Sequence, residues 1–236
     1  MSASITKTCK SCGANGAGNY CNMCGQPYTA SRISLSGIIK EAFHFFTHLD
    51  KGFPYTLKEL LIRPGQMERK YVEGVRQRHQ RPFSMFFLCA SFAALGIYWI
   101  NLSLIKYFNS GDAHEGAFFH KYWVLLQVVL MPFYALITWL FFKRSKYNYG
   151  EICVLMLYQF SFLFMLLTVI HLTKLIWHDY QTRYLELPLI IIYSTITNVS
   201  FFNKGSQPLV ILCSVLSIAL CFLLASTIQD LLVKAF

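Results

Sequence analysis

Charged residues are scarce in this chain: only 14% of its 236 residues are Asp, Glu, Lys or Arg, while 55% are hydrophobic. Soluble domains carry about 25% charged residues, so the shortage argues against a soluble globular protein. After residue 82 the chain contains apolar runs near or above the roughly 18 residues that mark a membrane span. We therefore expect an integral membrane protein.

Acidic residues are the scarcer kind of charge, with 11 Asp and Glu against 21 Lys and Arg, which leaves a net charge of +10. Residues 1–82 hold 12 of the basic residues but only 5 of the acidic ones, a net +7. Basic segments beside a span are attracted to anionic lipid headgroups. Because these charges crowd against the first apolar run, anionic lipid explains them more economically than nucleic acid does.

Catalytic motifs are missing as well. The chain contains no nucleophile elbow, no phosphate-binding loop, no H-E-x-x-H and no paired carboxylates in its apolar runs, so nothing in it supports an enzyme. A cleavable signal peptide is not expected either, because the first 30 residues are polar and lack an apolar h-region. We expect this N-terminal segment to stay attached, on the side of the membrane where the chain is made.

The front of the chain does carry a cysteine cluster, "CKSCGANGAGNYCNMCGQ" at residues 9–26. Two C-x₂-C pairs can present four thiolates to one ion, and the glycine after each pair allows the positive φ that turns backbone N–H groups toward sulfur. A closed Cys₄ site is structural, because it leaves no open coordination position. Iron uses the same ligands, whereas two disulfides are disfavoured in a cytoplasmic segment. We predict a zinc ribbon over residues 1–29, with ligands Cys9, Cys12, Cys21 and Cys24.

Residues 30–82 are predicted to form amphipathic and juxtamembrane helices. Apolar residues recur at close to helical spacing over residues 31–49, which indicates a helix lying on the bilayer surface or on the spans. Gly52 and Pro54 interrupt it. A short helix is expected over residues 56–62, with Thr56 and Glu59 as a capping box, and another through "QMERKYVEG".

Residues 83–236 are predicted to form an all-α polytopic membrane domain of about five helices. The apolar segments cover residues 83–105, 122–142, 152–173, 187–202 and 208–233, of which the fourth is the shortest and most polar. Ten Lys and Arg flank the spans on the side of the N-terminus and five on the other side. This bias predicts a cytoplasmic N-terminus and an external C-terminus.

Uncharged amides interrupt three of these spans: Gln127, Gln159 and Asn198. Intramembrane polar groups usually face the interior of the bundle, where they form functional sites or bind neighbouring helices together. Pro132 is expected to kink the second span. Four further cysteines, Cys89, Cys153, Cys213 and Cys221, stand singly in apolar runs and are expected to behave as small hydrophobic residues.

The ribbon ending in C-G-Q, followed by "TLKELLIRPGQMERKYVEGVRQRHQRPF", resembles an uncharacterised, Bacteroidetes-type bacterial membrane family, the domain of unknown function 3667 family. The resemblance covers residues 9–82 and implies a bacterial inner-membrane location but no known activity. The five-span layout is also distantly similar to that of Yip-domain proteins. The family pattern falls on Thr56, Leu57, Leu60, Arg63, Pro64, Gly65, Tyr71, Gly74, Arg76 and Pro82.

Four arginines, Arg63, Arg76, Arg78 and Arg81, lie within 19 residues at the entry to the first span. A guanidinium binds phosphate in a bidentate manner, so these side chains could hold a lipid phosphate or another anion. The alternative is that they act only as positive charges that fix the orientation of the spans.

Three functional classes remain open from the sequence. The favoured one is a membrane-surface scaffold or adaptor, which binds a protein partner through the ribbon and anionic lipid through the juxtamembrane segment, alone or as a homo-oligomer. The second is a transporter or lipid-moving protein with a path through the bundle along Gln127, Gln159 and Asn198. A membrane-embedded enzyme is the third. A polar cavity open to one side would favour the second class, and a dry, packed bundle the first.

Overall fold

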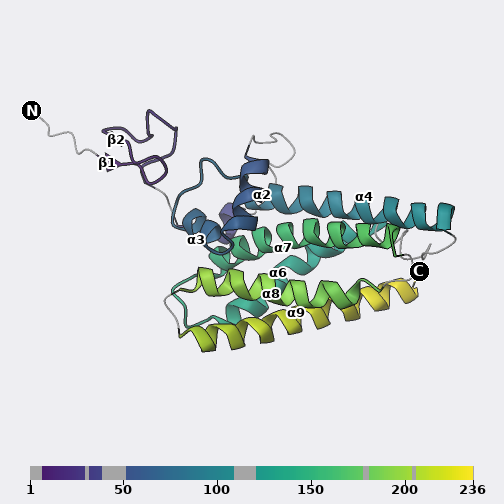
Figure 1. The fold of residues 1–236 in the computed structure, drawn as a ribbon. Coiled ribbons are helices and arrows are strands. Elements are labelled where there is room, and N and C mark those ends of the chain that lie inside the picture. Colours follow the sequence, from purple (N-terminus) through teal and green to yellow (C-terminus); the bar gives the residue numbers. More distant parts are fainter. Residues whose placement is uncertain are drawn as a thin grey trace, which may run out of the picture.

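In a computed structural model, residues 7–29, 32–38, 52–108, 121–177, 181–203 and 206–235 are described. Their long helices form an elongated bundle, with a small ribbon and two short helices at one of its ends (Figure 1). The helices are α2 (Phe53–Ile62), α3 (Gln66–Val72), α4 (Pro82–Phe108), α6 (Trp123–Phe141), α7 (Tyr149–Leu172), α8 (Arg183–Phe201) and α9 (Gln207–Ala235), and a single 3₁₀ turn, η2 (Thr173–Leu175), extends α7.

Five of the described helices, α4, α6, α7, α8 and α9, are long and apolar enough to cross a membrane. This confirms the predicted all-α polytopic class and all five predicted segments. The fourth helix begins at Arg183, four residues before the apolar run at residue 187. Successive helices run in opposite directions, so α4, α7 and α9 begin at the end that carries the ribbon, and α9 finishes at the other end (Figure 1).

Helix α7 is the centre of the bundle and contacts α2, α3, α4, α6 and α8. Its most extensive contact is with α4. Four small residues of α4, Cys89, Ala90, Ala93 and Ala94, are buried, and a β-carbon at Gly96 of α4 would meet the Thr168 side chain of α7 at 2.8 Å. Small side chains let helix backbones approach closely. Lipid is as apolar as the protein interior, so the van der Waals contacts made by close packing are a main source of stability between membrane helices.

The juxtamembrane helices differ from the sequence prediction in where α2 begins. Pro54, expected in the break that follows residues 31–49, lies in the first turn of α2, where its missing N–H costs nothing. The predicted capping box of Thr56 and Glu59 is therefore wrong. The Thr56 hydroxyl instead donates to the carbonyl oxygen of Gly52 at 2.8 Å and accepts from the backbone N–H of Gln80, also at 2.8 Å. Thr56 thus joins α2 to the loop that leads into α4.

Part of the predicted amphipathic helix at residues 31–49 lies outside the described residues. Its described start, residues 32–38, rests on the connection between α6 and α7. The guanidinium of Arg32 pairs with the Glu151 carboxylate at 2.8 Å, and the Asn148 side chain donates to the carbonyl oxygen of Ile33 at 3.1 Å. Asn148 and Glu151 also form the capping box at the start of α7, so one pair of side chains caps a helix and anchors the juxtamembrane segment.

Candidate metal centre and intramembrane cavity

The four predicted cysteine ligands converge beside a two-stranded hairpin, β1 (Lys7–Thr8) and β2 (Asn15–Gly16). Their sulfur atoms lie within 4.8 Å of one another, with Cys9 Sγ 3.6 Å from Cys24 Sγ and Cys12 Sγ 3.5 Å from Cys21 Sγ. Sulfurs bound to a tetrahedral zinc ion, each about 2.3 Å from the metal, stand about 3.8 Å apart. All eight cysteines are free. The cluster could hold a metal ion.

The backbone of each C-x₂-C turn favours metal binding. Gly13 and Gly25 adopt positive φ angles of 77° and 73°, and their N–H groups donate to the carbonyl oxygens of Cys9 and Cys21. These turns bring backbone N–H groups to the sulfur atoms, and the N–H of Cys12 lowers the pKa of the Cys9 thiol. A lowered pKa favours the thiolate, the form that binds metal. The pKa of Cys12 goes the other way: the Ala14 N–H lowers it, but the neighbouring thiols and burial raise it overall to about 12.

Gln26, the residue that follows the second turn, ties the ribbon to the loop after α3. The side chain is only 2% exposed. Its Nε2 donates to the carbonyl oxygen of Gly74, and its Oε1 accepts from the backbone N–H groups of Arg76 and Gln77, the latter at 3.0 Å. Sequence reasoning placed Gln26 only in the C-G-Q pattern and gave it no role. A polar residue directly after a metal knuckle was the available signal.

The R-P-G turn packs directly against the end of α8. Gly65 has a φ of 77°, and a β-carbon there would meet the carbonyl oxygen of Thr197, the Ser200 β-carbon at 2.6 Å and the Phe201 nitrogen at 2.8 Å. A glycine is needed at this position both for its backbone conformation and for the absence of a side chain. The predicted sharp turn therefore joins α2 and α3 to the bundle.

A buried carboxylate lies beside this turn, and the sequence analysis did not single it out. Glu68 is fully buried, and its Oε2 accepts from the Gly65 N–H at 2.7 Å. Its Oε1 has no hydrogen-bond partner in the described part of the chain. Burial raises the pKa of Glu68 to about 7, so this group titrates near neutral pH. Only its position in the first turn of α3, three residues after the glycine, could have indicated the cap.

Arg76, one of the four juxtamembrane arginines, is engaged within the protein. Its Nε donates to the carbonyl oxygen of Tyr71 at 3.2 Å, and its guanidinium lies 5.7 Å from the centre of the Tyr71 ring. The Tyr71 ring in turn meets Tyr158 of α7 edge-on, with 5.3 Å between ring centres. Arg76 therefore helps to hold the loop against the bundle.

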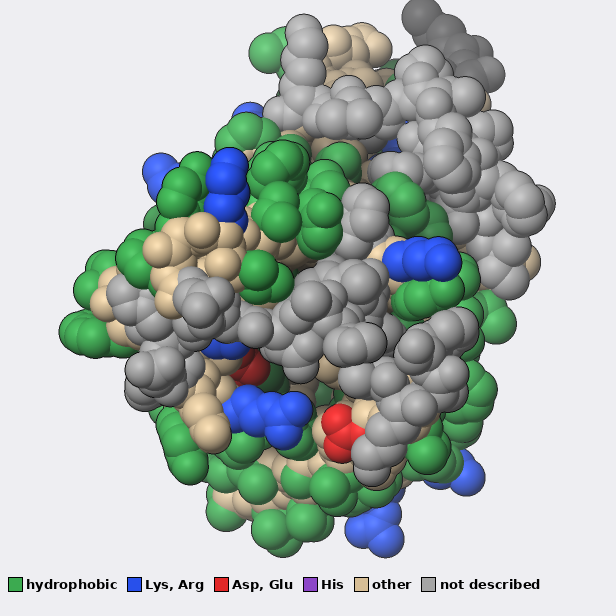
Figure 2. All heavy atoms as spheres, turned by 90° about the vertical axis from the view of Figure 1, so that its right-hand side faces the viewer, with side chains coloured by type: hydrophobic (Ala, Val, Ile, Leu, Met, Phe, Trp, Pro, Cys, Tyr) green, Lys and Arg blue, Asp and Glu red, His purple; other side chains and the backbone are tan. Residues whose placement is uncertain are grey.

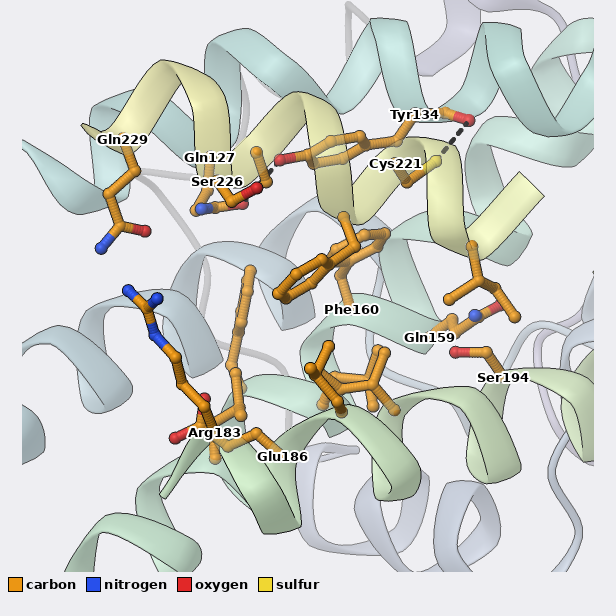
Figure 3. A pocket seen from close by; sticks show the side chains of 18 of the residues that line it. Gln127, Tyr134, Gln159, Phe160, Arg183, Glu186, Ser194, Cys221, Ser226 and Gln229 are labelled. Atoms are coloured by element: carbon orange, nitrogen blue, oxygen red, sulfur yellow. Dashed lines mark hydrogen bonds between the residues drawn. The ribbon is translucent and has the colours of Figure 1, made fainter. Parts of the chain in front are cut away.

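A cavity of about 590 Å³ lies between α6, α7, α8 and α9. All three polar residues predicted inside the spans line it: Gln127 from α6, Gln159 from α7 and Asn198 from α8. The structure thus brings together residues that are 71 positions apart in the sequence. Figure 3 shows Gln159 and Ser194 at one end of this space, Phe160 near its middle, and Arg183, Glu186 and Gln229 at the other end.

The cavity reaches the end of the bundle opposite the ribbon, where it is open. Gln181, Arg183 and Asp230 line it there and are exposed. Charges of both signs gather at this mouth, because Lys174 and Glu186 also line it and His171 Nδ1 lies 3.5 Å from Glu186 Oε1. Figure 2 faces this end of the bundle and shows basic and acidic side chains among a largely hydrophobic surface.

Comparison with known families agrees with the resemblance noted in the sequence. Residues 50–93 match the family described as Protein of unknown function (DUF3667). No curated protein and no solved structure matches the chain. The match covers α2, α3, the loop that binds Gln26 and the first half of α4, whereas the four cysteines and the cavity mouth lie outside it. The residues shared with DUF3667 are therefore those that connect the ribbon to the bundle.

The other three of the four juxtamembrane arginines are placed at the surface. Arg63 ends α2, and Arg78 and Arg81 belong to the loop before α4; all three are exposed. Exposure leaves them accessible to lipid headgroups, so an anionic contact through these three side chains stays a prediction.

Proposed function

We propose that this integral membrane protein admits a small amphipathic molecule into the cavity between α6, α7, α8 and α9, as a transporter or lipid-moving protein does. The observation that carries the proposal is a cavity of about 590 Å³ that is open at one end of the bundle and contains buried polar side chains. A scaffold needs no such space, and ligand sites in proteins commonly measure about 300–1,000 Å³.

The lining of the cavity supports an amphipathic ligand. Its middle is apolar and aromatic, with Phe160, Phe164 and Ile190 among the lining residues, and its mouth is charged. The inner end is polar as well, through Gln159, Ser194 and Asn198, so a molecule with an apolar body in the middle of the cavity could place a polar group at either end. We propose binding and movement of this molecule without chemical change.

A photoactivatable medium-chain alcohol tests the proposal. The protein is reconstituted in lipid nanodiscs, irradiated with the probe and analysed for labelled peptides. We expect labels on cavity-lining stretches of α8 and α9. Ala225→Trp fills the cavity and should abolish them, whereas Leu223→Trp, whose side chain is 57% exposed outside the cavity, should retain them. Equal labelling of the wild type and both variants would show that the probe reacts only from the lipid side.

We further propose that the ribbon holds zinc and lies in the cytoplasm of a bacterial cell, beneath the inner membrane. The basic loops at the ribbon end support this orientation, and the thiolate set suits zinc. Reporter fusions at residue 18 and after residue 236 should report opposite sides of the membrane, with the first reporter cytoplasmic. Two reporters on the same side would contradict the proposed topology.

A protein partner for the ribbon is a second candidate function. Tyr20 is 65% exposed and Met23 79% exposed, and large apolar side chains at such positions suit a binding surface. The double variant Tyr20→Ser, Met23→Ser should lose a partner that copurifies with the wild type while its metal content stays the same. Retention of that partner by the double variant would remove the ribbon from the interaction.

A further inference from the structure

The inner end of the cavity carries three polar atoms that lack hydrogen-bond partners in the described part of the chain. They are Gln159 Oε1, Ser194 Oγ and Asn198 Oδ1. The three side chains are 2%, 1% and 1% exposed. Ser194 and Asn198 lie one turn apart on α8, and Figure 3 shows Gln159 of α7 facing the same space as Ser194.

Several other polar residues of the cavity form hydrogen bonds within the protein, whereas Glu186 Oε1 at the mouth has only His171 near it, at 3.5 Å. Gln127 Oε1 accepts from the Tyr134 hydroxyl at 3.5 Å, Thr138 donates to the Met156 sulfur at 3.4 Å, and Ser217 donates to a backbone carbonyl. Buried polar groups in native proteins are nearly always paired, because an unpaired one keeps its full desolvation penalty. Three residues that line one end of the cavity thus each hold a buried, unpaired oxygen, and small side-chain rotations would let an external hydrogen-bond donor satisfy them.

The donor that fits this position is neutral. Gln159, Ser194 and Asn198 carry no charge, whereas the ionisable residues that line the cavity, among them Lys174, Arg183, Glu186 and Asp230, lie toward the mouth. A cationic group at the inner end would lose its hydration without gaining an opposite charge. A hydroxyl group supplies a hydrogen-bond donor without the cost of removing a charge from water. Phe160 and Ile190 lie next to the site and can pack against the apolar chain of the same ligand.

We propose that Gln159, Ser194 and Asn198 form a binding site for the hydroxyl group of a small, neutral, medium-chain amphiphile. This inference rests on the proposed function, because the amphiphile must first enter the cavity. It adds that the hydroxyl end goes to the inner end, with the apolar chain extending toward the mouth.

The test compares the photoactivatable alcohol with its methyl ether, which has the same chain and oxygen but no donor hydrogen. In wild-type protein we expect cavity labelling by the ether to be about tenfold weaker, the effect of roughly one net hydrogen bond. Gln159→Leu and Asn198→Leu should reduce labelling by the alcohol to the level of the ether. The control Ile190→Val, at an apolar lining position, should keep the preference for the alcohol.

The outcomes separate this inference from the proposed function. Equal cavity labelling by alcohol and ether would mean that water satisfies the three oxygens, which overturns the hydroxyl site and leaves the proposed function standing. Absence of cavity labelling by either probe would overturn both. Displacement of the alcohol by excess glycerol would show that a soluble polyol suffices and would overturn the assignment to a medium-chain amphiphile. Because both Leu variants remove unpaired polar groups, they should fold, and their melting temperatures check this.

Discussion

A β-carbon on Gly65 would collide with the carbonyl oxygen of Thr197, so the R-P-G turn and the end of α8 meet backbone to backbone. This contact joins residues 132 positions apart in the sequence and holds the short helices α2 and α3 against the bundle. This close contact explains why Gly65 follows Pro64 in the turn.

Gly65→Ala should destabilise the protein by about 3 kcal/mol or more. The alanine would be held at a positive φ, and its β-carbon would force α3 away from α8. Thermal unfolding in one detergent measures the change. Gly18→Ala is the matched control, because its β-carbon would meet nothing closer than 3.6 Å and should change stability by less than about 1 kcal/mol. Similar melting temperatures for the two variants would contradict the close contact.

Glu68 should make stability depend on pH. Burial raises its pKa in the folded state from 4.5 to about 7, so between these values the folded protein keeps a proton that the unfolded chain releases. Stability should therefore be greatest below about pH 4.5, fall as pH rises to about 7, and then level off, a loss of about 3 kcal/mol from this group. Glu68→Gln should remove this contribution, whereas Glu73→Gln, at an exposed position, should leave it. Parallel pH profiles for wild type and Glu68→Gln would show that the carboxylate does not titrate in this range.

Purified protein should carry about one metal ion per chain, with zinc expected over iron. Cys24→Ser removes one of the four ligands and should release the ion. Cys213→Ser, a partly buried cysteine of α9, should retain it. Elemental analysis of reduced protein measures both the amount and the identity of the metal. Metal-free wild-type protein, or full occupancy in Cys24→Ser, would rule out the cluster as the site.

Gln26→Ala should loosen the loop after α3 without removing the metal. The N–H groups of Arg76 and Gln77 donate to the Gln26 side chain, so their hydrogen exchange should accelerate by about tenfold, the effect of a lost hydrogen bond of roughly 1 kcal/mol. Asn22→Ala, an exposed position in the same ribbon, is the control. Unchanged exchange at residues 76 and 77 would show that the loop holds its conformation without the ribbon.

The juxtamembrane arginines should separate into two groups on exchange for lysine. Arg76→Lys should lower stability by about 1 kcal/mol, because lysine reproduces neither the Nε bond to Tyr71 nor the stacked guanidinium. Arg63→Lys should leave stability unchanged but reduce retention of anionic lipid through purification, if its guanidinium holds a phosphate in bidentate fashion. Arg78→Lys serves as the comparison for lipid retention. Equal retention in the Arg63 and Arg78 variants would leave only the orienting role of the charges.

The helices could be predicted because lipid imposes a simple rule on the chain. An apolar run of sufficient length has to satisfy its backbone hydrogen bonds internally, so its composition indicates a helix. The predicted start of α8 was four residues too late, because Arg183 and Glu186 are charged and interrupt the apolar pattern. These two residues lie at the cavity mouth, where charged side chains can be part of the helix. Thr56 was misplaced as a cap because a local pattern does not reveal a partner such as Gln80, which lies 24 residues away.

The candidate sites were also predictable to different degrees, because a local sequence pattern does not reveal partners that are distant in the sequence. The cysteine ligands lie within 16 residues, and their spacing alone indicates the metal site. Gln127, Gln159 and Asn198 could be recognised as unusual within spans, but their shared cavity depends on how α6, α7 and α8 pack. Gln26 and Glu68 act through contacts that form only after folding. A single polar residue outside the apolar spans is common, so it stands out less than a pair of C-x₂-C motifs or an amide inside a span.

The central position of α7 has a consequence for how the protein is made. Synthesis delivers the spans in order, so α4 and α6 reach the bilayer before the helix that later covers most of the packed face of α4. In the finished protein α4 contacts α6 far less than it contacts α7. A nascent chain that has not yet released α7 therefore holds two spans with little contact between them, and assembly of the bundle begins with the third insertion event.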